Sequence, residues 1–299
     1  MSSPKHQAII ALIFANVIWG AASPIIKWSL TDIHPLTLAF FRFFLATLLL
    51  LPFCINNLAI KKKDIHLFII MAFFGITLNI GLYFIALTFT DSINSPLIGS
   101  SVPILVIIAS IFFLHQKANL RIIAGSFIAL LGILVILLEP IIEKGLTGTF
   151  TGNMLLVIAS FCGVVHIFTS TRLSQTYRSI TITFYSFLLG AASFTPFFLF
   201  EVGKYGLPTL TMQSGIGVLY TAVLSSCLAH LLFYKAERSL KPQESALFNY
   251  IPPVIAILVA VPLLGEKVTP LFLLGGILVF LGLYIAKAHH KVHGLHHHR

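Results

Sequence analysis

Long apolar segments separated by short polar or charged connections run along almost the whole chain. A transmembrane helix needs about 20 mostly apolar residues, and ten windows meet this requirement. They are Ala8–Leu30, Pro35–Asn56, Ile65–Thr88, Ser92–Leu114, Leu120–Leu138, Gly152–Leu173, Ile180–Phe200, Ser214–Ala236, Pro242–Leu264 and Pro270–Lys287. The pattern predicts an all-α polytopic membrane protein with ten transmembrane helices and no extramembrane domain.

Composition and charge support this prediction and orient the chain. Hydrophobic residues make up 58% and charged residues 9%, whereas soluble proteins carry about 25% charge, which excludes a soluble enzyme. If the N-terminus is cytoplasmic, 14 of the 19 Lys and Arg lie on that side, and the other five are Lys27, Arg42, Lys144, Lys204 and Lys267. By the positive-inside rule both termini are then cytoplasmic, so the net charge of +10 does not indicate nucleic acid.

The two halves of the sequence resemble each other. A shift of 150 residues aligns Tyr83–Leu134 with Phe233–Tyr284 without a gap, pairing Pro103 with Pro253 and Gly132 with Gly282. Since five spans precede the join, the second copy enters the membrane from the opposite side. We therefore expect inverted five-helix repeats at residues 8–140 and 150–288, and a His-rich cytoplasmic tail at 289–299. Inverted repeats provide a route to alternating access, which favours a transporter over a scaffold.

Several short motifs connect the chain to a known family. They are Trp19-Gly20, His34-Pro35 followed by Arg42, and Leu264-Gly265-Glu266-Lys267 followed by Leu274-Gly275 and Leu281-Gly282. In this order they resemble the EamA-domain branch of the drug/metabolite transporter superfamily, with two EamA repeats. The first copy departs from the pattern at Leu114-His115-Gln116-Lys117. The resemblance implies transport of amino acids, other metabolites or drugs, or import of nucleotide-like compounds, and leaves the substrate open.

Prolines near the middle of spans four and nine mark candidate helix breaks. A proline inside a helix leaves the carbonyl four residues earlier without its usual donor, and in lipid that carbonyl needs another partner. Pro103 leaves the carbonyl of Gly99 free, and Pro253 leaves that of Asn249. We therefore expect Gly99, Pro103, Pro252 and Pro253 to be helix-break or gating residues beside a central cavity. The alternative is that the prolines only curve their helices.

Polar residues at membrane depth are the candidates for substrate binding, because each is costly in lipid. They are Asn16, Trp19, Asn79, Tyr83, Ser100, His166, His230, Asn249 and Tyr250. Each could instead only bridge helices. The set offers hydrogen bonds and aromatic faces without a carboxylate, which suits a neutral or zwitterionic solute.

The charged residues of the spans bear on substrate charge and on energy coupling. Arg42 and Lys27 lie near the outer ends of their spans, from which long side chains can reach the interface. The acids lie at span ends, so a mid-membrane carboxylate proton carrier is not expected. His166 and His230 could carry a proton, but facilitated or exchange transport is favoured.

Small residues form matching faces on spans five and ten. Gly125, Ala129 and Gly132 lie on the first, and Gly275, Val279 and Gly282 on the second. Such faces let helices approach closely, either to join the repeats of a monomer or to form the seam of a homo-oligomer. The three cysteines lack CxxC spacing, and neither a metal nor a cofactor is expected.

Together these patterns predict an exporter of small metabolites, with amino acids favoured, in the inner membrane of a bacterial cell. Its expected partners are a small-molecule solute and the lipid bilayer. An alternative on the same fold is uptake or exchange of a larger metabolite such as a nucleoside derivative. A membrane-embedded enzyme acting on lipid is disfavoured, because the acids are scattered among connections and no HExxH spacing occurs.

Overall fold

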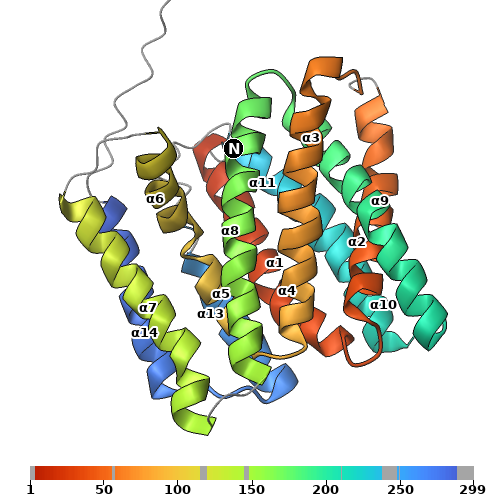
Figure 1. Ribbon diagram of the computed structural model, residues 1–299. Helices are drawn as coiled ribbons and strands as arrows, with labels where there is room; N and C mark the ends of the chain where they lie inside the picture. The colour runs from red at the N-terminus through yellow and green to blue at the C-terminus, as the bar shows by residue number, and fades with distance from the viewer. Residues whose placement is uncertain are drawn as a thin grey trace, which may run out of the picture.

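The computed structural model describes residues 4–55, 58–114, 120–144, 148–209, 211–237, 248 and 250–287. Its helices follow one another through the bundle drawn in Figure 1. They are α1 (Pro4–Ser29), α2 (Pro35–Cys54), η2 (Lys62–Asp64), α3 (Ile65–Ala72), η3 (Phe73–Leu78), α4 (Asn79–Leu87), α5 (Asn94–Gly99), α6 (Val102–Leu114), α7 (Leu120–Lys144), α8 (Gly148–Ser174), α9 (Ser179–Tyr205), α10 (Met212–Leu219), η4 (Tyr220–Leu228), α11 (Ala229–Glu237), α13 (Ile251–Leu264) and α14 (Pro270–Lys287).

The helices confirm the predicted all-α fold of ten spans. In the described ranges, eight helical stretches are long and apolar enough to cross a membrane, and two shorter apolar helices lie at Ile251–Leu264 and Pro270–Ala286. In the predicted ninth span, residues 242–247 and 249 lie outside the described residues. Several helices extend past the predicted spans, as α9 does to Tyr205, because hydropathy marks the hydrocarbon region whereas helical hydrogen bonding continues into the interface.

The two halves are related by inversion. In Figure 1, α1 begins at the end marked N, and α8 begins at the opposite end of the bundle. The first helix of each half packs on equivalent helices of the other half. Helix α1 packs on α11 and α13, which belong to spans eight and nine, and α8 packs on α4, α5 and α6, which belong to spans three and four. The pairs α2 with α9 and α7 with α14 each join equivalent spans. The predicted inverted repeat is therefore confirmed.

Spans three and eight each contain a π-helical segment, which the hydropathy pattern did not predict. The segments are Phe73–Leu78 and Tyr220–Leu228. A shift of Phe73–Leu78 by 150 residues gives positions 223–228, which lie inside the second segment. π-Helical turns are rare and occur often at functional sites. Their equivalent positions indicate that the wide turn is part of the repeat unit.

Span four is interrupted just before its proline. Helix α5 ends at Gly99 and α6 begins at Val102, and between them the hydroxyl of Ser100 donates to the carbonyl of Leu97 at 2.6 Å. Pro103 is thus in the first turn of a new helix, where its missing N–H removes no hydrogen bond. Pro252 likewise lies in the first turn of α13. These prolines start helices, whereas the sequence pattern had placed them at mid-span.

Two apolar clusters make up most of the core. One lies among α1, α2, α4 and α9 and includes Phe43, Phe84 and Phe194. The other lies among α5, α7 and α14 and includes Leu97 and Val279. Tyr83 packs against both clusters, so α4 joins the two parts of the core.

The small faces of spans five and ten pack on each other within one chain. A Cβ atom added to Gly282 would lie 2.5 Å from the carbonyl oxygen of Gly125, and one added to Gly132 would lie 2.6 Å from that of Gly275. Both distances are shorter than van der Waals contact, so α7 and α14 approach to a separation that only glycine permits. This contact joins the two repeats, and the faces are not available as the alternative dimer seam.

We expect Gly282→Ala to destabilise the protein. Its new methyl group would overlap backbone atoms of α7, which cannot move aside cheaply, and such overpacking costs about 1–3 kcal/mol. Thermal unfolding in detergent should show a lower Tm. Gly203→Ala is the matched control, because its Cβ would meet no atom within 4 Å and alanine favours the helix. An equal Tm for the two variants would contradict the proposed close contact.

Candidate functional site

A cavity of about 390 Å³ lies among α1, α4, α5, α6, α8 and α13, and we call it the central cavity. It brings together four predicted substrate-binding residues, which are Asn16, Trp19, Tyr83 and Ser100, and three predicted break residues, which are Gly99, Pro103 and Pro252. Its other lining residues are Ser23, Ser95, Pro96, Val102 and Ile167. Residues from both repeats therefore line one space.

Trp19 and Gly20, which the sequence motif places side by side, make different contacts in the structure. The indole nitrogen of Trp19 donates to the carbonyl of Ser225 in η4 at 3.1 Å. A Cβ added to Gly20 would lie 2.8 Å from the carbonyl oxygen of Pro252. Because neighbouring residues on a helix point in different directions, the tryptophan reaches the cavity while the glycine admits the start of α13.

The hydroxyl of Ser23, in the wall of the central cavity, is a buried polar group without a well-formed hydrogen bond to any described residue. The residue is 2% exposed, and its hydroxyl has no hydrogen-bond partner of good geometry among the described residues. Buried polar groups are almost always hydrogen-bonded. The hydroxyl of Tyr83 lies close to it on the same wall, so the two hydroxyls form a polar pair that a bound solute can contact.

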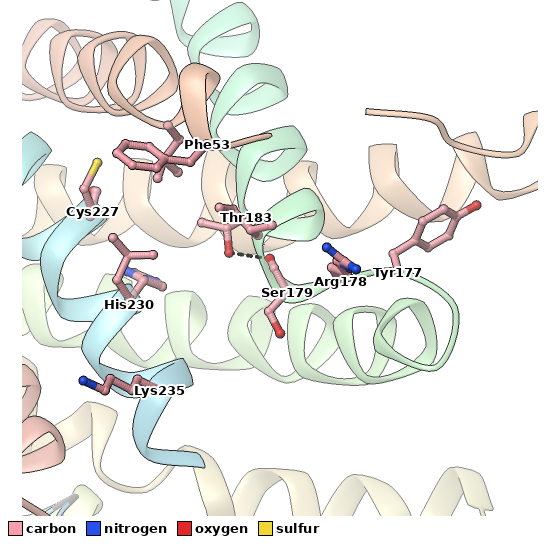
Figure 2. Close-up of a pocket in the computed structure, with 12 residues that line it drawn as sticks. Phe53, Tyr177, Arg178, Ser179, Thr183, Cys227, His230 and Lys235 are labelled. Carbon is pink, nitrogen blue, oxygen red and sulfur yellow. Dashed lines mark hydrogen bonds between the residues drawn. The ribbon is translucent and has the colours of Figure 1, made fainter. Parts of the chain in front are cut away.

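A larger cavity of about 740 Å³ lies among α2, α9, η4 and α11, and we call it the basic cavity. In Figure 2, Cys227, His230 and Lys235 face Ser179 and Thr183 across it. The remaining lining residues are Leu50, Phe53, Tyr177, Arg178, Ile180, Ser226 and Leu231. Among the described residues, no acidic side chain lines it.

The basic cavity runs from an exposed mouth to a buried floor. Arg178 and Lys235 are exposed, while Ser226 and Cys227 are buried. Tyr177 and Arg178 of the α8–α9 connection line the cavity at this mouth. In Figure 1 this connection lies at the same end of the bundle as the start of α1. On the orientation that the positive-inside rule predicts, this end is cytoplasmic, and the cavity would open on the cytoplasmic side.

Tyr177 holds the α8–α9 connection at this mouth. Its hydroxyl donates to Asp64 at 2.7 Å and accepts from the backbone N–H of Lys61 at 3.0 Å. Desolvation and the hydrogen bond to Asp64 raise the pKa of the Tyr177 hydroxyl. It therefore remains a neutral donor at physiological pH and ties the connection to the start of span three.

A thin partition separates the two cavities. Trp19 lines the central cavity and His230 lines the basic cavity, and their ring centroids are 5.2 Å apart in an edge-to-face arrangement. The carbonyl of Ser225, in the π-helical segment, accepts from Trp19 and lies 3.2 Å from Nδ1 of His230. The wide turn of η4 thus supplies the acceptor around which the partition is built.

Arg42 corrects an expectation from the sequence. A side chain near the outer end of its span was expected to reach the interface, yet Arg42 is 7% exposed and points into the bundle. Its guanidinium donates to the hydroxyls of Ser226 at 3.0 Å and Ser225 at 3.4 Å. The interior of the protein therefore holds a fixed positive charge, which the sequence analysis missed. The pair Ser225-Ser226 in an otherwise apolar span was the feature of the sequence that could have indicated a buried polar partner.

The opposite end of the bundle is closed by a set of charged contacts that we call the outer clasp. Lys27 pairs with Glu266 at 2.9 Å and with Asp91 at 3.2 Å. Glu266 also accepts from the backbone N–H groups of Ser92 at 2.7 Å and Ile93 at 3.1 Å. A carboxylate is favourable at a helix N-terminus, here that of α5. The outer clasp therefore ties α1, α5 and the α13–α14 connection together.

Another outer acid has a similar structural role. Glu201, at the end of α9, accepts from the backbone N–H and the hydroxyl of Thr37, both at 2.7 Å. It thereby satisfies donors in the first turn of α2. Three of the acids that the sequence placed at outer span ends, Glu139, Glu201 and Glu266, are buried at 8% exposure each. Asp32 and Asp91 lie at the same end and are partly exposed.

Of the remaining predicted residues, those that the structure describes do not line either cavity. Asn79 donates to the carbonyl of Ala159 at 2.5 Å, and Tyr250 packs edge-to-face on Phe280. Pro253 is buried in α13. Asn249 lies outside the described residues, as does the tail at 289–299.

His166 lies against the π-helical segment of span three. Its Nδ1 is 3.3 Å from the carbonyl of Met71, and a Cβ added to Gly75 would overlap the ring. The histidine therefore bridges α8 and span three. Among the described residues, no group of three His, Cys, Asp or Glu side chains could hold a metal ion.

Comparison with known proteins identifies the family. The chain matches the EamA-like transporter family over residues 6–138 and 150–287. An uncharacterized transporter of Archaeoglobus fulgidus is 27% identical over 292 residues, covering 96% of this chain and 99% of its own. The uncharacterized transporter YetK of Bacillus subtilis is 26% identical over 283 residues, covering 93% of this chain and 86% of its own.

A solved structure supports the fold independently. A crystal structure whose description names no function superposes with a TM-score of 0.64 at 16% identity, covering 94% of this chain and 96% of its own. This similarity bears on the fold alone, whereas the family match extends over both halves of the sequence. The chain belongs to the EamA-like transporter family and is a multi-pass membrane transporter with two EamA domains.

Proposed function

We propose that the protein exports a small metabolite, with amino acids as the favoured class, across the cytoplasmic membrane by alternating access. The observation that carries the proposal is the pair of cavities separated by Trp19 and His230 in a bundle of inverted repeats. A solute entering the basic cavity from the cytoplasm needs to pass only this partition to reach the central cavity.

The two ends of the bundle differ in the way that alternating access requires. The basic cavity opens at the cytoplasmic end, while Lys27, Asp91 and Glu266 close the outer end. Because each repeat can adopt the conformation of the other, exchange of the two conformations would close the first end and open the second. The equivalent π-helical segments, six residues long in η3 and nine in η4, are the elements in which we expect that exchange.

The placement of charge bears on the driving force. The acids whose side chains are described lie at helix ends or in connections, as Asp32, Asp64, Asp91 and Glu139 do. We therefore infer facilitated or exchange transport driven by the gradient of the solute. The lining residues offer hydroxyl, amide and aromatic groups, which suit a small solute with both polar and apolar parts.

Efflux from proteoliposomes tests this function. Vesicles loaded with a panel of labelled amino acids should lose label when they contain the protein, and Trp19→Phe should slow the loss by roughly three- to tenfold, because one hydrogen bond contributes about 0.5–1.5 kcal/mol. Trp28→Phe is the matched control, since Trp28 lines neither cavity. Absence of efflux for every amino acid, or counterflow only with external nucleosides, would overturn the proposal.

Weakening of the outer clasp should open the outer end. Glu266→Gln removes the charge that pairs with Lys27, and a hydrogen bond to a charged group contributes about 1.5–3 kcal/mol. A cysteine at Ser95 in the central cavity, in a background without the three native cysteines, should then react about tenfold faster with an impermeant maleimide added outside.

Glu201→Gln provides the control for this experiment. Glu201 is another outer acid with 8% exposure, but it contacts α2 through Thr37 and takes no part in the outer clasp. Its variant should leave the maleimide reaction unchanged. Equal rates for wild type and the Glu266 variant would show that the outer clasp does not control access.

A further inference from the structure

The surroundings of Arg42 do not balance its charge. The guanidinium donates to two neutral hydroxyls, those of Ser225 and Ser226. It also lies over the rings of Phe43 and Phe84, at 5.1 Å and 5.7 Å from their centroids. Across the described ranges no carboxylate lies within 4.0 Å of it.

Such an arrangement is unfavourable unless something compensates the charge. A guanidinium removed from water loses its hydration, and hydroxyls and aromatic faces replace only part of it. Buried charges in proteins are normally paired with an opposite charge. A buried arginine without a carboxylate partner among the described residues is therefore a group that an anion from outside the chain can pair with.

Arg42 lies at the partition between the two cavities. Its partner Ser226 lines the basic cavity, and its other partner, Ser225, also accepts a hydrogen bond from Trp19 of the central cavity. The guanidinium of Arg42 also lies close enough to Tyr83, in the wall of the central cavity, to interact with it electrostatically. A solute that moves between the cavities therefore passes within reach of the guanidinium.

The approach to Arg42 is also positive. Arg178 and Lys235 are exposed at the mouth of the basic cavity. In the part of the chain that the structure describes, no acidic residue lines this cavity. A cavity lined by charges of one sign raises the local concentration of oppositely charged solutes. Anions from the cytoplasm are thus attracted toward the floor of the cavity. Ser226 forms part of this floor and accepts a hydrogen bond from Arg42.

We propose that Arg42 is the receptor for a carboxylate group of the transported solute. This inference rests on the proposed transport function and narrows its substrate class to solutes with a carboxylate, whether zwitterionic or singly anionic. The planar guanidinium matches a carboxylate with two parallel hydrogen bonds, and release of Ser225 and Ser226 would free the donors for it. One guanidinium balances one negative charge, so a phosphate ester, with a charge of about −2 at neutral pH, fits less well.

The first test needs no ligand. Arg42→Gln removes an uncompensated buried charge and retains a polar side chain that can reach the serines, so we expect its Tm in detergent to rise by about 2 °C or more. Arg172→Gln is the control, because Arg172 is exposed at the end of α8 and its loss should leave the Tm unchanged. If Arg42 only held the helices together, its replacement would lower the Tm.

The second test uses ligands matched in shape. Purified wild-type protein is heated with L-leucine, L-leucinamide or 4-methylpentanoate, and with the corresponding phenylalanine series, because a ligand of the folded state raises the Tm. We expect the compounds with a carboxylate to stabilise the protein and the amides to have at least tenfold weaker effects. Chloride and inorganic phosphate at the same concentrations report binding of an adventitious anion.

The Arg42 variants complete the experiment. Arg42→Gln should abolish the response to the carboxylates, and Arg42→Lys should weaken it, because a lysine keeps the charge without the planar pair of donors. Equal stabilisation by acid and amide, equal responses of wild type and Arg42→Gln, stabilisation by chloride or phosphate alone, or no response of wild type to any carboxylate would each overturn the proposal.

These outcomes separate this inference from the proposed transport function. A wild-type protein that carries uncharged solutes in proteoliposomes but neither binds nor carries carboxylates retains the transport function and loses the role of Arg42. Conversely, carboxylate-dependent stabilisation that Arg42→Gln removes, together with the absence of amino-acid efflux, supports the carboxylate site and overturns amino-acid export.

Discussion

Hydrocarbon does not solvate polar groups, so each polar group at membrane depth needs a partner inside the protein. This constraint accounts for most polar contacts of the bundle. Asn79 donates to a carbonyl of α8, and Trp19 donates to the carbonyl of Ser225 in the π-helical segment. Two groups that fulfil the constraint poorly, the hydroxyl of Ser23 and the charge of Arg42, lie at or beside the cavities. The buried hydroxyl of Ser126 on α7 also lacks a partner among the described residues but lines neither cavity. The incomplete satisfaction of Ser23 and Arg42 thus coincides with the space through which a solute would pass.

The same bundle combines rigid and adjustable contacts. The glycine faces of α7 and α14 bring two backbones together without intervening side chains, and such a contact has little freedom to repack. The partition and the outer clasp consist instead of side-chain rings, ion pairs and caps of helix ends, which can separate and form again. A transporter needs both kinds of contact, because one part of the bundle has to stay joined while the other moves.

Both the fold and part of the candidate site followed from local sequence patterns. Spans of apolar residues, the bias of basic residues and the aligned prolines predicted ten helices and their inversion. Asn16, Trp19 and Tyr83 line one cavity, in agreement with the idea that scarce polar residues face the interior. The same idea could not distinguish them from His166, which bridges two helices, because a cavity wall and a helix contact both demand partners for a polar group.

Hydropathy and repeat spacing by themselves determined the spans and the inverted repeat, and charge bias predicted their orientation, since these depend on local composition and on the solvent around each segment. Tertiary structure alone decided which residues meet. It placed Arg42 beside Ser225 and Ser226, more than 180 positions away in the chain. It also paired Gly125 with Gly282. Such contacts depend on the relative rotation and depth of two helices, and these are set by the packing of all neighbouring helices together.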